Sequence, residues 1–300
     1  MKKKTYLFAL MAMALTLGSC SDNENGIGGE TSKYITVSTS IGNMTRVATD
    51  EKGGQTFEEG DEISVYAWTG DATVAPETRE RVVNNAINKL TNGSWVSTPQ
   101  MLWKNNRDKH YFIGVYPISA ISDLSAGEYT FDVNKQTESD LLVAVNKDGL
   151  SYNVDEQQTV PLTFTHVMAK LVVNLTYKNQ WGGIPTVEKV VVGNAAKEAT
   201  INYLTKVVTP STTAKEDFSL PEITENTKYV SVIIPQEEVK QLTIVIGGKN
   251  FVYDNGTPFK LESGKITTVN LEVGRDEIKL GDVKITDWEN GSTFSGEALN

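Results

Sequence analysis

Short runs in which apolar and polar residues alternate recur along most of the chain, with turn residues between them. In residues 34–41 the side chains Ile35, Val37 and Ile41 fall on one face of an extended strand, opposite threonine and serine. Comparable runs follow at residues 63–68, 111–116, 129–133, 141–145, 187–192, 199–204, 229–234, 242–246, 251–253 and 266–273. Many short strands separated by turns predict an all-β protein built from sandwiches.

Two other segments have distinct patterns. The apolar residues of 81–90 have helical spacing, but Asn84, Asn85 and Asn88 weaken a helix, so the pattern leaves helix and strand open. Residues 247–250 read Gly-Gly-Lys-Asn between two apolar runs, which predicts a β-hairpin.

Residues 159–175 form the longest alternating stretch and lie near the middle of the chain. Their outward positions change from odd to even residue numbers near Val167, which predicts a β-bulge there. We expect this stretch to link two β domains, an N-terminal one over residues 34–163 and a C-terminal one over residues 164–300.

The N-terminus has the pattern of a secretory signal peptide over residues 1–19. Three lysines at positions 2–4 precede an apolar run over residues 6–17, which is shorter than the about 20 residues that cross a membrane as a helix. Leu17-Gly18-Ser19-Cys20 resembles a lipobox, in which lipid is attached to the cysteine and the chain is cut before it. Cys20 is the single cysteine of the chain, so we favour a lipoprotein over an ordinary signal peptide with a chance cysteine.

Residues 20–33 read as an acidic polar tether. Within it, Ser-Asp-Asn-Glu-Asn at residues 21–25 resembles the export signal that sends some bacterial lipoproteins to the cell surface, although a plain tether looks similar. The prediction is a protein anchored to the outer membrane through lipid alone and displayed on the cell surface.

Charge and cysteine content restrict the partners. Removal of residues 1–19, which carry three lysines and no acid, leaves 281 residues and takes the formal net charge from −10 to −13. Phosphate backbones repel such a chain, and no basic stripe with interleaved aromatics is present, so we predict no nucleic-acid partner. With Cys20 lipidated, no thiol remains for a disulfide, a metal site or a nucleophile.

No pattern typical of catalysis stands out. The carboxylates of residues 58–62 lack the spacing of a calcium loop and read as a solvated turn. Of the two histidines, His110 and His166, the second lies on a predicted strand and is interpreted as structural. The chain has no G-x-S-x-G elbow, phosphate-binding loop or H-E-x-x-H pair. We therefore predict neither an enzyme nor a bound cofactor or metal.

Tryptophans provide an alternative function, because exposed indole rings can stack on sugars. A surface-anchored β-sandwich that binds glycans is compatible with the residues, as is a core position for each ring. The chain has five tryptophans: Trp68, Trp95, Trp103, Trp181 and Trp288.

Several motifs together resemble the fimbrillin family, the subunits of type V pili. The central one, residues 164–171, reads Phe-Thr-His-Val-Met-Ala-Lys-Leu and is similar to the family's F-x-H-x-x-A-K-L core. The others, in chain order, are Gly60-Asp61-Glu62-Ile63-Ser64-Val65-Tyr66, Tyr116-Pro117, Asp140-Leu141-Leu142-Val143-Ala144 and Ile285-Thr286-Asp287-Trp288-Glu289-Asn290-Gly291.

The resemblance implies two Greek-key β-sandwich domains with transthyretin-like topology, lipoprotein export and assembly into adhesive surface fimbriae with other fimbrial subunits. It also favours a strand for residues 81–90. Non-polymerising members remain compatible with it, and so does the glycan-binding alternative, with host or bacterial surface glycans as partners.

The resemblance further implies that an arginine-directed protease removes the first strand, opening a groove for a neighbour's strand. The candidate cleavage site is Arg46–Val47, in a polar loop after the strand that carries Ile35, Val37 and Ile41. The candidate donor is the tail, residues 278–300, whose apolar residues alternate on either side of a break at Gly281-Asp282; they are Ile278, Leu280, Val283, Ile285 and Trp288. Alternatively, the tail is simply the last strand of the second domain and Arg46 an ordinary loop residue.

Overall fold

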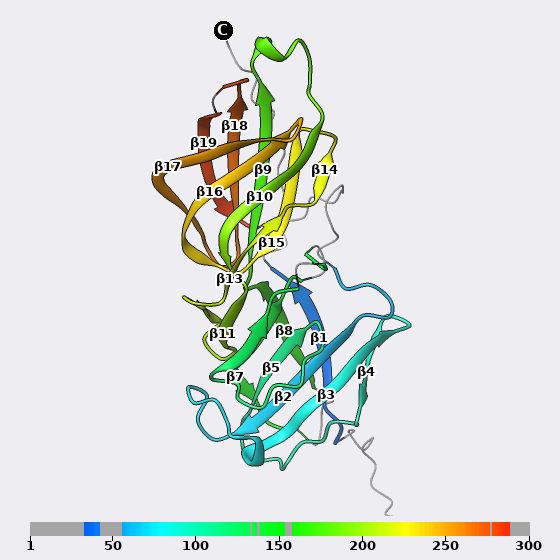
Figure 1. Ribbon diagram of the computed structural model, residues 1–300. Helices are drawn as coiled ribbons and strands as arrows, with labels where there is room; N and C mark the ends of the chain where they lie inside the picture. The colour runs from blue at the N-terminus through cyan, green and yellow to red at the C-terminus, as the bar shows by residue number, and fades with distance from the viewer. Residues whose placement is uncertain are drawn as a thin grey trace, which may run out of the picture.

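The computed structural model describes residues 33–42, 56–132, 134–136, 139–153, 158–276 and 278–288. These residues form β-strands almost throughout, which confirms the predicted all-β class (Figure 1). Their only helical turns are the short 3-10 helices η1 (Thr78–Glu80) and η2 (Asn179–Trp181). Within the described residues no helix has the length and apolar character needed to cross a membrane.

The N-terminal half of the chain builds a seven-stranded sheet in the order β1-β8-β7-β5-β2-β3-β4. Its strands are β1 (Thr36–Ile41), β2 (Glu62–Thr69), β3 (Arg81–Thr91), β4 (Ser94–Thr98), β5 (His110–Tyr116), β7 (Leu142–Leu150) and β8 (Thr159–His166). Both faces are covered: Val65 and Ala67 of β2 belong to one core cluster, and Tyr66 and Trp68 of the same strand to the other.

Residues 81–90 form a strand, as the family resemblance implies. Val65 of β2 pairs with Ala86 and Ala67 pairs with Val83, so β3 has an extra residue between these pairs. Asn85 lies at this bulge with φ of 55°. The bulge places Val83 and Ala86 on one buried face three residues apart, and this is why the sequence has helical spacing.

The C-terminal half contains a four-stranded sheet, β13-β10-β16-β17, and a five-stranded sheet, β14-β15-β9-β18-β19. The strands are β9 (Ala169–Tyr177), β10 (Val187–Ala196), β13 (Lys215–Ser219), β14 (Glu222–Thr224), β15 (Lys228–Ile233), β16 (Gln236–Ile246), β17 (Lys249–Leu261), β18 (Lys265–Val273) and β19 (Ile278–Asp287). Val190 and Leu242 of the first sheet share a core with Leu171 and Val269 of the second, as in a β-sandwich. The predicted hairpin joins β16 to β17, and Gly247 and Gly248 adopt positive φ as its two-residue turn requires.

The two halves meet where β8 passes into β9. The predicted bulge near Val167 is wrong: β8 ends at His166 and β9 begins at Ala169, so the change of outward face marks the passage from one sheet to another. A fourth, three-stranded sheet also bridges the halves, because β6 (Gly127–Thr130) pairs with β11 (Glu198–Asn202), which pairs with β12 (Val207–Pro210). Division into two Greek-key domains stays a prediction, and its boundary after Thr163 falls inside β8.

Candidate functional site at the terminal strands

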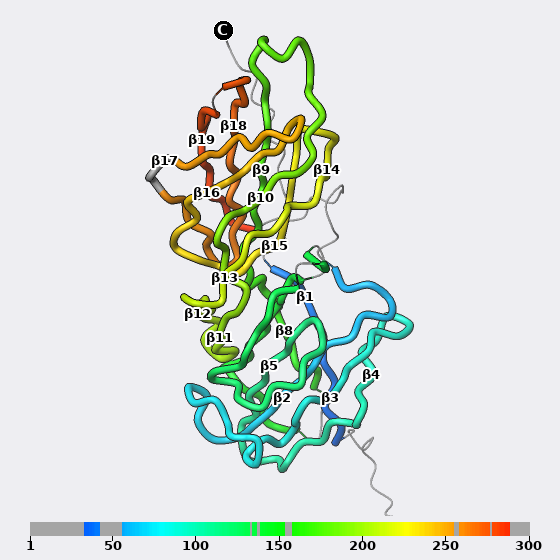
Figure 2. The backbone as a smooth tube through the Cα atoms, in the orientation of Figure 1, coloured from blue at the N-terminus to red at the C-terminus, as the bar shows by residue number. Residues whose placement is uncertain are grey.

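The first strand lies at an edge of the seven-stranded sheet, in parallel with β8. The pairing runs from Thr36 opposite Thr159 to Ile41 opposite Phe164. The next amide, of Gly42, donates to the carbonyl of Phe164 at 2.8 Å. Figure 2 shows this strand in blue in the lower half of the molecule, whereas β19 lies in red and brown in the upper half.

The inward face of the first strand is deeply buried. Ile35, which directly precedes β1, is 2% exposed, and Val37 and Ile41 are each 6% exposed. They pack in the cluster that contains Phe164 and Phe112. Because these side chains cover apolar residues of the rest of the sheet, taking this segment away would uncover an apolar groove along the edge of β8.

Hydroxyl groups on both faces of β1 add polar contacts, Ser40 on the outward face and Thr39 on the inward face. Ser40 Oγ donates to Thr163 Oγ1 at 3.2 Å, and the indole Nε1–H of Trp95 donates to Thr39 Oγ1 at 3.0 Å. The strand is therefore held by a backbone ladder, buried apolar side chains and polar side-chain contacts.

The last strand, β19, pairs with β18 in antiparallel fashion, from Ile278 opposite Val273 to Asp287 opposite Lys265. The predicted break at Gly281-Asp282 is present, because the register shifts between the pairs of Val269 and Leu271. In this structure the tail segment 278–288 thus lies at the edge of the chain's own five-stranded sheet.

The apolar residues of β19 are less covered than those of the first strand. Ile278, Leu280 and Val283 are half-buried, and Ile285 is 37% exposed. Each of these side chains is therefore less completely buried than Ile35, Val37 and Ile41 of the first strand.

The C-terminal end of β19 is held more firmly, through contacts of Trp288 with the rest of the protein. The Trp288 ring lies parallel to the His166 ring, with centroids 4.0 Å apart and an interplanar angle of 4°. His166 Nδ1–H donates to Asp140 Oδ2 at 2.6 Å, and the Lys170 ammonium lies 5.4 Å from the centre of the Trp288 ring. The Trp288 amide donates to the Gly264 carbonyl at 3.0 Å.

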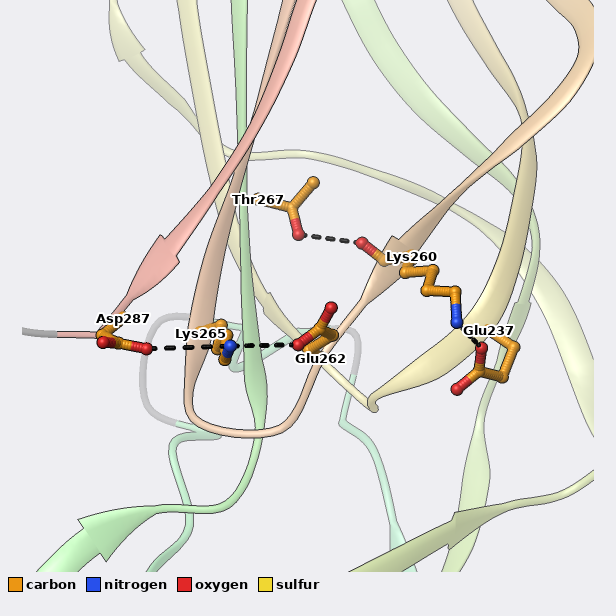
Figure 3. A network of polar contacts seen from close by, with 6 residues as sticks. All are labelled: Glu237, Lys260, Glu262, Lys265, Thr267 and Asp287. Carbon is orange, nitrogen blue, oxygen red and sulfur yellow. Dashed lines mark hydrogen bonds and ion pairs between the residues drawn. The ribbon is translucent and has the colours of Figure 1, made fainter.

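An ion-pair network lies beside this stack (Figure 3). Lys265, the first residue of β18, points toward Glu262 at 3.2 Å on one side and Asp287 of β19 at 3.8 Å on the other. The same network continues through the backbone of Lys260, whose carbonyl accepts a hydrogen bond from Thr267, to Glu237.

Both histidines are hydrogen-bonded to other groups of the chain. His110 is buried; its Nε2 accepts from the Lys104 amide and its Nδ1–H donates to the Asp108 carbonyl. Burial lowers the pKa of His110 below its ordinary value. His166 contacts Asp140 and Trp288, and the structural role interpreted from the sequence stays a prediction. Among the residues the structure describes, no group of three His, Cys, Asp or Glu side chains is placed to hold a metal ion.

The tryptophans differ in their availability. Trp68 and Trp103 are buried, which removes them as platforms for a sugar. The indole of Trp181 donates to the Val273 carbonyl at 2.9 Å, and an arginine, Arg275, lies over its ring. With Trp288 stacked on His166 and Trp95 bonded to Thr39, the three half-buried rings all have partners inside the chain.

A family model described as fimbrillin-like matches residues 45–288. The chain belongs to the fimbrillin-like family. The resemblance drawn from the motifs is thereby confirmed, and the matched region begins after β1 and ends at Trp288, the residue on which the last strand is fastened.

Several proteins similar to this fimbrillin-like chain come from Bacteroides. A Bacteroides uniformis protein named "Putative fimbrium subunit Fim1C" is 25% identical, over 99% of this chain and 100% of its own length. A crystal structure titled "putative cell adhesion protein", also from B. uniformis, shares the fold with a TM-score of 0.64 at 18% identity, covering 86% of this chain and 100% of its own. A fimbrial protein from B. vulgatus matches with a TM-score of 0.53 at 12% identity, covering 85% and 99%.

The structure brings together residues that the sequence analysis left apart. Asp140, His166 and Trp288 each belong to a different motif of the fimbrillin resemblance, yet they form one contact chain. In the sequence, the only signal that links these three residues is that each belongs to a motif of the fimbrillin resemblance. Cys20, Arg46 and Val47, the predicted lipidation and cleavage residues, lie outside the described residues.

Proposed function

We propose that this protein is a structural or adhesive subunit of fimbriae on the cell surface and does not act as an enzyme. Membership of the fimbrillin-like family supports this proposal, as does the fimbrium-subunit name of its B. uniformis relative. Lipidation at Cys20 anchors the exported precursor to the outer membrane, and other fimbrial subunits, identical or related, are its partners.

The observation that carries the proposal is the buried first strand at a sheet edge. Full burial of each of Ile35, Val37 and Ile41 contributes about 1.5–3 kcal/mol, so the strand contributes roughly 5–9 kcal/mol as an upper estimate. This is comparable to the ~5–15 kcal/mol stability of a whole domain. A groove emptied of this strand is strongly driven to bind another, and the open edge of β8 offers backbone donors and acceptors to it.

Cleavage at Arg46–Val47 by an arginine-directed protease is the proposed trigger. Arg46 is four residues beyond Gly42, where the first described segment of the chain ends. The region matched by the family model begins at residue 45. The segment that would be lost therefore lies almost entirely before the region that the family model matches.

The proposed donor is β19 of a neighbouring subunit. It is an edge strand whose apolar residues are less completely buried than those of the first strand, which supports its release from its own sheet. Ile278, Leu280, Val283, Ile285 and Trp288 supply the apolar residues for the groove.

The test is assembly of the purified mature protein after treatment with an arginine-specific protease. We expect filaments in electron micrographs of the wild type, and monomers from Arg46→Gln. The control Arg79→Gln removes an exposed arginine paired with Glu77 and should assemble like the wild type. Complete cutting at Arg46 with no filaments would refute strand exchange. Binding of the uncut monomer to a glycan array, lost on replacing Trp95 or Trp181, would favour the glycan-binding alternative.

A further inference from the structure

The C-terminal end of β19 contacts the C-terminal end of β8, which is the strand that pairs with β1. His166 is the final residue of β8, and its ring covers the Trp288 ring that follows β19. Asp140, in the segment that precedes β7, fixes the imidazole through the 2.6 Å hydrogen bond to Nδ1. Lys170, at the start of β9, lies over the same indole. The stack thus joins two strands that belong to different sheets.

The position of β8 depends strongly on the first strand. Six residues of β8, Thr159 to Phe164, pair with β1, whereas only Phe164, Thr165 and His166 pair with β7. On its β1 side, Phe164 also accepts the hydrogen bond from Gly42. Without β1, residues 159–163 of β8 would keep no residue pairs in a β ladder, and His166 would be held by a ladder of three residue pairs.

We propose that His166 and Trp288 form a latch that keeps β19 in its own sheet while β1 is in place. Both are positioning residues in the subunit before assembly: they hold the last strand in its own sheet until it is released. Loss of β1 loosens β8, moves His166 away from Trp288, and so allows β19 to detach. The inference rests on the proposed function in assuming that β19 leaves its sheet.

The rest of β19 is weakly held, so the His166–Trp288 stack at its end is important for keeping the strand in its sheet. The bulge at Gly281-Asp282 interrupts its ladder, and Ile285 is substantially exposed. The Lys265–Asp287 contact is long, and both of these side chains are solvent-accessible, so this pair contributes little. The aromatic stack and the Trp288–Gly264 hydrogen bond are the contacts best placed to hold the end of the strand.

Hydrogen–deuterium exchange of the uncut full chain tests the latch, read on peptides that cover residues 278–288. We expect His166→Ala and Trp288→Ala to speed exchange in this segment by roughly 2- to 12-fold, which corresponds to a typical aromatic pair. Trp288→Phe, which preserves a stacked ring, should stay closer to the wild type. The control Lys260→Met removes the ion pair to Glu237 in the network of Figure 3 and should leave exchange in β19 unchanged.

A second arm uses wild-type protein cut at Arg46 and stripped of its first strand, in which exchange of residues 278–288 should rise. The same treatment should add little in Trp288→Ala, whose latch is already open. If His166→Ala fails to fold, Asp140→Asn, which weakens the orientation of the imidazole, replaces it and should give a smaller rise.

Unchanged exchange of β19 in Trp288→Ala would overturn the latch, as would an equal rise in every sheet, which would indicate global destabilisation. The result separates the two proposals. Filaments that form normally while β19 exchange is insensitive to Trp288 would refute the latch and leave strand exchange standing. Selective opening of β19 in a protein that never polymerises would support the latch and refute the proposed assembly.

Discussion

Truncation of Ile41 to alanine should destabilise the uncleaved protein substantially. Ile41 is the last residue of β1, is 6% exposed, and pairs with Phe164 inside the core cluster. Removing most of a buried isoleucine side chain costs about 2–5 kcal/mol, from the lost transfer free energy and from the cavity that remains. We expect Ile41→Ala to reduce the free energy of unfolding by an amount in this range.

Urea unfolding, followed by intrinsic fluorescence, measures this loss. With a slope of about 3 kcal/mol per molar urea, a loss of 2–5 kcal/mol lowers the midpoint by roughly 0.7–1.7 M. Ser38→Ala is the matched control, because Ser38 lies on the exposed face of the same strand. Surface substitutions of this kind stay within about 0.5 kcal/mol, which is less than ~0.2 M.

The same variant also tests the energy that drives the groove to refill. After cleavage at Arg46, a loss of at least ~2 kcal/mol should favour dissociation of the first strand by about 30-fold or more, since 1.4 kcal/mol corresponds to tenfold. Size-exclusion chromatography of the cut protein separates the released peptide from the body. If Ile41→Ala shifts the urea midpoint no further than Ser38→Ala, the burial argument for strand exchange is wrong.

Three further predictions concern the anchor, the donor and a buried histidine. Cys20→Ala should release the protein from the membrane fraction and abolish lipid labelling; continued sedimentation with labelled membranes would contradict lipidation. Deletion of residues 278–300 should leave subunits that are cut at Arg46 but remain monomeric by electron microscopy, so filaments of normal length would rule out the tail as donor. Because burial lowers the pKa of His110, the unfolded chain binds a proton at higher pH than the folded chain, so stability present above about pH 6.5 should fall as the pH drops below it. Urea midpoints across that range should fall less steeply in His110→Gln.

Local alternation predicted most strands because it depends on neighbours in the sequence. The strand with Ile35, Val37 and Ile41, the hairpin at Gly247-Gly248 and the break at Gly281-Asp282 are all present in the structure. In each case the pattern of side chains, or the φ required of glycine, depends on a few consecutive residues.

Bulges and sheet changes were harder to predict, because they change the side-chain period without changing the composition. The bulge at Asn85 gave β3 the spacing of a helix, and the passage from β8 to β9 looked like a bulge near Val167. Pairing of β6 with β11 joins segments about seventy residues apart and depends on tertiary contacts alone. The depth of burial of β1 relative to β19 likewise depends on what packs over each strand.

Residues from several family motifs contact one another at the joint between the two halves of the chain. Asp61, from the motif that begins β2, accepts a hydrogen bond from Tyr116 at 3.3 Å, and Tyr116 belongs to a second motif. Asp140, His166 and Trp288, from three others, form the chain of contacts at the passage from β8 to β9. These side chains meet where the sheet that holds the first strand joins the sheet that holds the last. A sequence signature that fixes this joint supports the proposed function, in which the two terminal strands are held and then released.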